Sequence, residues 1–320
     1  MTRQSLERYQ VAIYLLAILF GLVGGALLPE ARPFSEPLLW PILGLLLYAT
    51  FTQIPLARLP EALGDRRFLI AAVLGNFVIL PVVVWGLVQL APQDPAIRLG
   101  ILLVLLVPCT DWFIAFTQLG GGDGRHAIAF APLSLLLQLL LLPFYLWLFF
   151  ERDLTIGLAS RELLLAFVSL ILLPLLAAGL TQAWSARHTP AMRLLDALGW
   201  FPVPLLAVVV LLIAVSQVNT VVDSAHWLAW VAPLFIAFLL LAALLARVLA
   251  GAFRLPTTQA RVLAFSFGTR NSFVVLPIAL ALPTAFELTA VVIVMQSLVE
   301  LLGMAVFLWW VPRYLFPLST

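Results

Sequence analysis

Ten stretches of about twenty apolar residues follow one another along this chain with little sequence between them. A helix needs about 20 consecutive apolar residues to cross a bilayer. Only 10% of the residues are charged, against about 25% in a soluble domain. We therefore expect an all-α polytopic membrane protein surrounded by a lipid bilayer. The expected spans are residues 9–28, 36–57, 68–91, 97–119, 126–150, 161–183, 195–217, 226–250, 259–281 and 286–312.

The arginines orient these spans, because cytoplasmic loops of membrane proteins carry an excess of positive charge. One side of the bundle holds four of them, Arg32, Arg98, Arg152 and Arg161. The side of the N-terminus holds twelve: Arg3, Arg8, Arg58, Arg66, Arg67, Arg125, Arg187, Arg193, Arg247, Arg254, Arg261 and Arg313. We expect a plasma (inner) membrane protein with both termini in the cytoplasm.

Two spans are interrupted near their middles by polar or helix-breaking residues. The fourth contains Pro108–Asp111 and the ninth contains Gly268–Ser272. Each is the fourth span in its half of the chain, residues 1–150 and 161–312. An odd number of spans per half places the second half upside down in the membrane. Interrupted helices at matching positions of inverted halves indicate a transporter substrate site.

These interruptions supply the candidate substrate-binding residues. Asp111 and Arg270 are ionisable at membrane depth, which favours a functional assignment. If the interruptions cross, the two side chains can approach, either within a substrate site or as a structural ion pair that pins the crossing. Cys109 is open to two interpretations, a small packing residue or a soft ligand for metalloids. The full set is Cys109, Thr110, Asp111, Arg270, Asn271 and Ser272.

Further polar residues lie inside other spans. Glu300 is a costly carboxylate in the tenth span. It is expected to bind a coupling proton, as is Asp111, to partner Arg270, or to hydrogen-bond a neighbouring helix. The weaker, supporting polar candidates are Asn76, Gln138 and Gln296.

The segments around the interruptions resemble those of a known family. "GILLVLLVPCTDWFIAFTQLGGGDGRHAIAF" resembles helices four and five of the bile acid:sodium symporter superfamily, and "LAFSFGTRNSFVVLPIALAL" is similar to its broken ninth helix. "SLVELLGM" resembles the tenth helix of its arsenite-efflux branch, the arsenical-resistance-3 permeases. The resemblance implies ten helices in two inverted five-helix repeats. Helices 3–5 and 8–10 would form a core domain, and helices 1, 2, 6 and 7 a panel domain.

The resemblance also implies a transport function, with departures from the family pattern. A cysteine in helix four matters in the arsenite branch, and Cys109 matches it, although Pro108 replaces the usual preceding Arg. Ser266, Arg270 and Phe273 stand where the sodium-coupled branch binds sodium. The positive charge of Arg270 would repel that ion, so we expect coupling to protons or to the membrane potential.

Two transport functions follow as hypotheses. The first is arsenite or antimonite efflux that depends on Cys109, and the alternative is transport of an organic anion bound by Arg270. A membrane sensor or scaffold is disfavoured, because paired interruptions and buried charge would then have no use. No phosphate loop or nucleophile–base spacing indicates an enzyme. We expect no cofactor, no metal cluster and no nucleic-acid partner.

Overall fold

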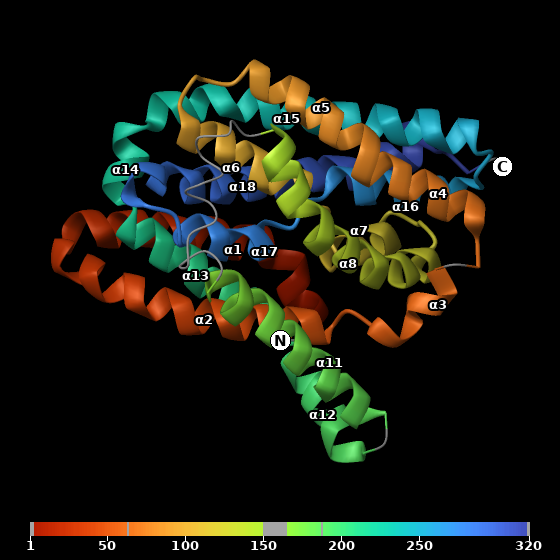
Figure 1. Ribbon diagram of the computed structural model, residues 1–320, viewed down its shortest axis with the longest axis horizontal. Coiled ribbons are helices and arrows are strands. Elements are labelled where there is room, and N and C mark those ends of the chain that lie inside the picture. The colour runs from red at the N-terminus through yellow and green to blue at the C-terminus, as the bar shows by residue number, and fades with distance from the viewer. Residues whose placement is uncertain (1–2, 63, 150–164, 187, 319–320) are drawn as a thin grey trace.

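The computed structural model describes the chain except residues 1–2, 63, 150–164, 187 and 319–320, and it is helical almost throughout (Figure 1). The helices are α1 (Arg3–Leu27), α2 (Arg32–Thr52), α3 (Leu59–Ala62), α4 (Arg66–Leu74), α5 (Leu80–Gln89), α6 (Pro95–Leu106), α7 (Trp112–Leu119), α8 (Gly124–Phe149), α11 (Leu173–Ser185), α12 (Thr189–Leu198), α13 (Pro202–Ser216), α14 (Val218–Asp223), α15 (Ala225–Ala252), α16 (Thr257–Gly268), α17 (Ser272–Leu280) and α18 (Glu287–Trp310).

The helices pack in two groups (Figure 1). In the first group α1 and α2 both lie against α13, and α11 lies against α2. In the second group α6, α15 and α17 pack around α18, while α16 contacts α15, α7 and α8. The two groups meet where α1 touches α18 and α17 touches α2. We call them the α1–α13 group and the α18 group.

Six helices of the described residues are long and apolar enough to cross a membrane, or seven if the pair Pro190–Leu198 and Pro202–Ser216, bent by 42°, is one span. The interrupted spans fail this test because each is divided into two short helices. The chain is therefore a multi-pass, helical membrane protein. The ten-span inverted repeat stays a prediction. Arg152, Arg161, Arg187 and the start of the sixth predicted span lie outside the described residues.

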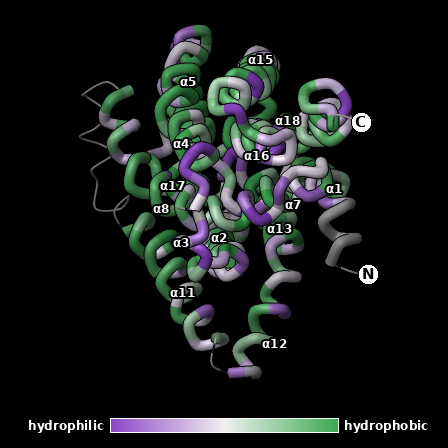
Figure 2. The backbone as a smooth tube through the Cα atoms, turned by 90° about the vertical axis from the view of Figure 1, so that its right-hand side faces the viewer, coloured by the Kyte–Doolittle hydropathy of each residue, from purple (hydrophilic) through white to green (hydrophobic). Residues whose placement is uncertain are grey.

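The outer helix faces are apolar, as contact with lipid requires. Leu140 and Trp147 of α8 are 74% and 65% exposed, and Leu176 and Leu180 of α11 are 68% and 72% exposed. Figure 2 shows hydrophobic residues running along α5, α8 and α11. Soluble monomers rarely expose continuous apolar surfaces of this extent. These faces are suited to acyl chains rather than water.

Two glycines let α1 approach α13 closely. A Cβ atom added at Gly21 would lie 2.6 Å from the carbonyl oxygen of Leu211, and one at Gly25 would lie 2.5 Å from that of Val215. Spaced four residues apart, the glycines form the small-residue motif that allows helix backbones to meet in membranes. Gly24, between them in sequence, would have no atom within 4 Å of an added Cβ.

A π-helical turn, Gly75–Ile79, joins α4 to α5. Pro81 follows it and has no N–H to donate, so the carbonyl of Phe77, four residues earlier, loses its helical partner. The Tyr145 hydroxyl of α8 donates to that carbonyl instead. Such turns project side chains off the regular helix register, and this one directs Asn76 into the protein interior, where it is fully buried.

A polar cluster ties together the beginnings of α4 and α8 on the side predicted to face the cytoplasm. Asp65 and Asp123 accept backbone N–H groups as the caps of these helices. His126 bridges them, with its Nε2 3.4 Å from the Asp65 carboxylate and its Nδ1 2.9 Å from that of Asp123. Burial raises the pKa of both carboxyls, but hydrogen bonds outweigh it and hold each pKa below its ordinary value: backbone N–H groups and His126 donate to both, and Gln259 also donates to Asp65.

Candidate functional site

The two interruptions cross, and their extended backbones hydrogen-bond to one another. The N–H of Cys109 donates to the carbonyl of Thr269 at 3.1 Å, and the N–H of Asn271 donates to the carbonyl of Val107 at 2.8 Å. Irregular backbone at membrane depth must find partners within the protein. The pairing meets that need, because the extended segment at each interruption supplies hydrogen-bond donors or acceptors to the extended segment at the other.

Arg270 places its guanidinium among a set of oxygen acceptors. Its Nη2 donates to the Asn76 side-chain oxygen at 3.1 Å and to the carbonyls of Ser266 and Phe267 at 3.3 and 2.7 Å. Its Nη1 donates to the carbonyl of Leu105 at 3.2 Å. The side chain is buried. We call these four acceptors the oxygen cage.

The expected ion pair between Asp111 and Arg270 is wrong: neither of the two ion pairs found among the described residues includes either side chain. The carboxylate of Asp111 instead accepts the thiol of Cys109, with Sγ 3.0 Å from Oδ1. Helix ends explain the separation. Asp111 stands at the positive, N-terminal end of α7, whereas the guanidinium reaches the negative, C-terminal ends of α6 and α16.

Glu300 lies on α18 beneath the crossing and is buried. Its Oε2 accepts the backbone N–H of Arg270 and the side-chain amide of Gln296, both at 2.8 Å. Gln296 in turn accepts the hydroxyl of Ser272 at 3.2 Å, and Ser297 donates to Ser272 at 2.7 Å. A continuous hydrogen-bonded chain therefore runs from Ser297 to Glu300. Glu300 is therefore a hydrogen-bond partner of the Arg270 backbone N–H rather than of its guanidinium.

The remaining predicted residues divide between the crossing and the periphery. Thr110 and Asn271 are joined across it, because the Asn271 amide donates to the Thr110 hydroxyl at 3.2 Å. Asn76 also donates to the Ser266 hydroxyl at 2.9 Å. Gln138 is buried on α8, and its amide has no hydrogen-bond partner among the described residues. It is not part of the network at the crossing.

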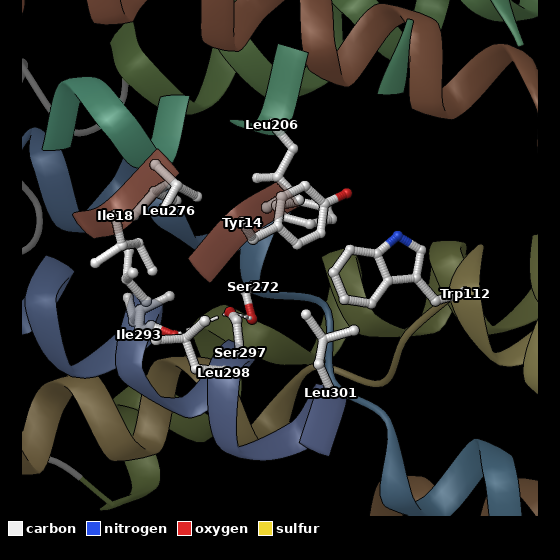
Figure 3. A pocket seen from close by; sticks show the side chains of 13 residues that line it. Tyr14, Ile18, Trp112, Leu206, Ser272, Leu276, Ile293, Ser297, Leu298 and Leu301 are labelled. Atoms are coloured by element: carbon white, nitrogen blue, oxygen red, sulfur yellow. Dashed lines mark hydrogen bonds between the residues drawn. The ribbon is translucent and has the colours of Figure 1, made fainter. Parts of the chain in front are cut away.

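A cavity opens beside the crossing, at the seam between the two helix groups (Figure 3). It is narrow, because the space open to the centre of a water molecule is only about 20 Å³, roughly enough for one water molecule. The α1–α13 group contributes Tyr14, Ile18, Leu206 and Val210, and the α18 group contributes Trp112, Ser272, Phe273, Leu276, Ile293, Val294, Ser297, Leu298 and Leu301.

Of the thirteen residues that line the cavity, only Ser272 was predicted as a site residue from the sequence. Three of the others are aromatic. Tyr14 and Trp112 stack with ring centroids 6.1 Å apart, and Trp112 meets Phe273 edge-on at 5.1 Å. Figure 3 shows Tyr14 and Trp112 on one side of the cavity and the hydroxyls of Ser272 and Ser297 on another. The sequence could have indicated two of these aromatic residues by their position, since Trp112 directly follows Asp111 and Phe273 directly follows Ser272.

Residues 40–224, more than half of the chain, match the profile of the Sodium Bile acid symporter family. The chain belongs to this family. The matched segment includes the first interruption and ends before the second. No curated protein matched the sequence. Members of the Sodium Bile acid symporter family are transporters, so the chain is a secondary transporter for a small solute. No group of three His, Cys, Asp or Glu side chains in the described parts of this family member could hold a metal ion.

Proposed function

We propose that this chain extrudes arsenite and antimonite across the plasma membrane. The observation that carries the proposal is the thiol–carboxylate pair at the crossing, with Cys109 Sγ 3.0 Å from Asp111 Oδ1. A thiolate is a soft ligand suited to a trivalent metalloid, and a neighbouring carboxylate can accept its proton. No other residue of the chain could supply a thiol, because Cys109 is its one cysteine.

The chemistry is a reversible ligand exchange without change of oxidation state. Arsenite enters as the neutral trihydroxide. The Cys109 sulfur forms a bond to arsenic, one arsenic–oxygen bond breaks, and the thiol proton passes by way of Asp111 to the leaving hydroxide, which departs as water. Thr110 follows Cys109 in the same interruption, so its hydroxyl is a candidate hydrogen-bond partner for the oxygens that remain on arsenic. Water reverses the exchange on the other side of the membrane. A single thiolate holds the metalloid loosely enough for release.

The surroundings of Arg270 weaken the alternative in which this residue binds an organic anion. Four of its hydrogen bonds go to the oxygen cage, and an anion would have to displace them. The mainly apolar lining of the cavity nevertheless suits a hydrocarbon body, provided that the two helix groups move apart to enlarge it. Transport of such an anion is therefore the second candidate, with Ser272 and Ser297 as hydrogen-bond donors to its charged group.

We further propose that the chain forms ten spans in two inverted repeats, residues 1–150 and 161–312, with both termini in the cytoplasm. Asp111 and Glu300 are the candidate carriers of a coupling proton. The membrane potential is the other candidate driving force, and sodium is disfavoured. The remaining crossing residues, Asn271, Asn76 and Gln296, support the site through hydrogen bonds.

The test is growth of an arsenite-sensitive, efflux-deficient bacterium that expresses the wild-type chain or Cys109→Ser over a series of arsenite concentrations. The wild type should protect and Cys109→Ser should not, at equal amounts of folded protein measured by size-exclusion chromatography. Arsenate is the control solute, since the pentavalent oxyanion does not exchange ligands with a thiol in this way. Protection that persists in Cys109→Ser contradicts the thiol chemistry. No protection by well-expressed wild type favours the organic anion.

A further inference from the structure

The oxygen cage around Arg270 has the composition of a cation site. Its four acceptors are three backbone carbonyls and one side-chain amide oxygen, at 2.7–3.3 Å from the guanidinium nitrogens. No carboxylate touches the guanidinium within the described residues. The nearest such partner, Glu300, accepts the backbone N–H of Arg270 instead. Neutral oxygens thus surround a full positive charge.

The cage is assembled by elements far apart in the sequence. Leu105 lies in the last turn of α6, and Ser266 and Phe267 lie in the last turn of α16. The carbonyls of a last turn have no partner within their own helix, and they carry the negative end of the helix dipole. Asn76 reaches them from the π-helical turn. In transporters with discontinuous helices, such C-terminal ends and unwound carbonyls coordinate the coupling sodium or proton.

A sodium ion does not fit this arrangement as it stands. The family is described as one of sodium symporters, but here the guanidinium already takes the oxygens that such an ion would need. The ring of Phe238 covers it further, with its centroid 5.1 Å from the guanidinium carbon, in the geometry of a cation–π contact. A second cation near this charge would be repelled.

We propose that Arg270 is a tethered cation, which stabilises the helix crossing as a bound sodium ion would, so that the protein neither needs nor binds sodium there. A free ion can leave with the solute and so couple its own gradient to transport. A guanidinium on the backbone cannot leave. The same reasoning predicts that the cage, once emptied, takes a small monovalent cation. The proposal rests on the crossing and holds whichever solute is transported.

The test is the unfolding temperature of the purified, full-length protein in detergent, in NaCl, KCl or choline chloride of equal ionic strength and without arsenite. Wild type and Arg270→Lys, which keeps the charge, should unfold at the same temperature in all three salts. Arg270→Gln removes the charge and leaves the four oxygens in place. It should unfold at a lower temperature in choline and recover by at least about 3 °C in about 100 mM NaCl, because a ligand that binds only the folded state stabilises it.

Two results would overturn the proposal. Stabilisation of wild type or Arg270→Lys by sodium would show a free sodium site and a guanidinium that does not replace the ion. Folded Arg270→Gln with the same unfolding temperature in all three salts would show that the cage is not a cation site. If Arg270→Gln cannot be purified in any salt, sodium has failed to replace the guanidinium, and the cation-site prediction is wrong. None of these readouts involves arsenite, so failure here and failure of the efflux assay are separate.

Discussion

Replacing one glycine of α1 should separate two helices that frame the cavity. In Gly25→Ala the new methyl group would lie 2.5 Å from the Val215 carbonyl oxygen and 2.9 Å from its Cα. Both are backbone atoms, which cannot rotate away. Carbon contacts are most favourable at about 3.5–4.0 Å, so α1 has to retreat by about 1 Å. Gly21→Ala meets the backbone of Leu211 in the same way.

The free-energy cost follows from the geometry. Overpacking of this kind costs about 1–3 kcal/mol. We expect the unfolding temperature of Gly25→Ala to fall by about 2–12 °C, at about 2–4 °C per kcal/mol for a large domain. One displacement relieves both clashes, so the double variant Gly21→Ala/Gly25→Ala should lose little more than the worse single variant. The measurement is thermal unfolding of detergent-purified protein.

Gly24→Ala is the matched control, because an added Cβ there meets no atom within 4 Å. Its unfolding temperature should equal or exceed that of wild type, since alanine favours helix over glycine. Tyr14 and Ile18 share this helix with the glycines at a spacing of three or four residues, so the retreat of α1 should also widen the cavity that these two side chains line. A Gly25→Ala protein as stable as Gly24→Ala would refute the close-approach argument.

Glu300→Ala should lower the free energy of unfolding by about 2–6 kcal/mol, because two buried donors lose their acceptor at about 1–3 kcal/mol each. Glu300→Gln keeps an oxygen and should unfold close to the wild-type temperature. Equal losses in both variants would contradict the role assigned to these hydrogen bonds. Tyr145→Phe should cost about 1–3 kcal/mol in thermal unfolding, because the Phe77 carbonyl loses its donor, and an unchanged unfolding temperature would show that the π-helical turn does not need it. The depressed pKa values of Asp65 and Asp123 predict a stabilisation that is present above about pH 4 and lost as the pH falls through the folded-state values. Asp65→Asn should therefore differ most from wild type near neutral pH and converge with it in acid, as measured by unfolding temperature against pH; a constant difference would show that the carboxylate charge is not responsible.

The sequence was sufficient for the membrane class and for the places where helices break. Apolar runs report directly on lipid contact, and the polar and helix-breaking residues clustered at Pro108–Asp111 and Gly268–Ser272 mark the two interruptions. The partner of Arg270 was beyond such reasoning. The sequence shows which side chains have opposite charges. It does not show which backbone carbonyls lie unpaired at helix ends, because every residue type has a carbonyl. Whether the guanidinium of Arg270 meets a carboxylate or helix-end carbonyls depends on the geometry of the fold.

Other features left readable but weaker signals. The pair Gly21 and Gly25 has the spacing of a close helix contact, although the sequence could not identify α13 as its partner. Pro81 indicates that a carbonyl four residues earlier lacks a donor, but not that the turn widens and directs Asn76 inward. The cavity was unpredictable because its walls come from both helix groups, so no single stretch of sequence contains it.

The position of the cavity at that seam separates two tasks that a transporter must perform. Its walls belong to the two helix groups, so any sliding or rocking of the α1–α13 group against the α18 group would change the volume and the accessibility of the cavity. The crossing, with its cage and its Glu300 network, lies within one body and can travel intact. Such a motion would reshape the cavity while the hydrogen bonds of the crossing, which all lie within the α18 group, stay intact.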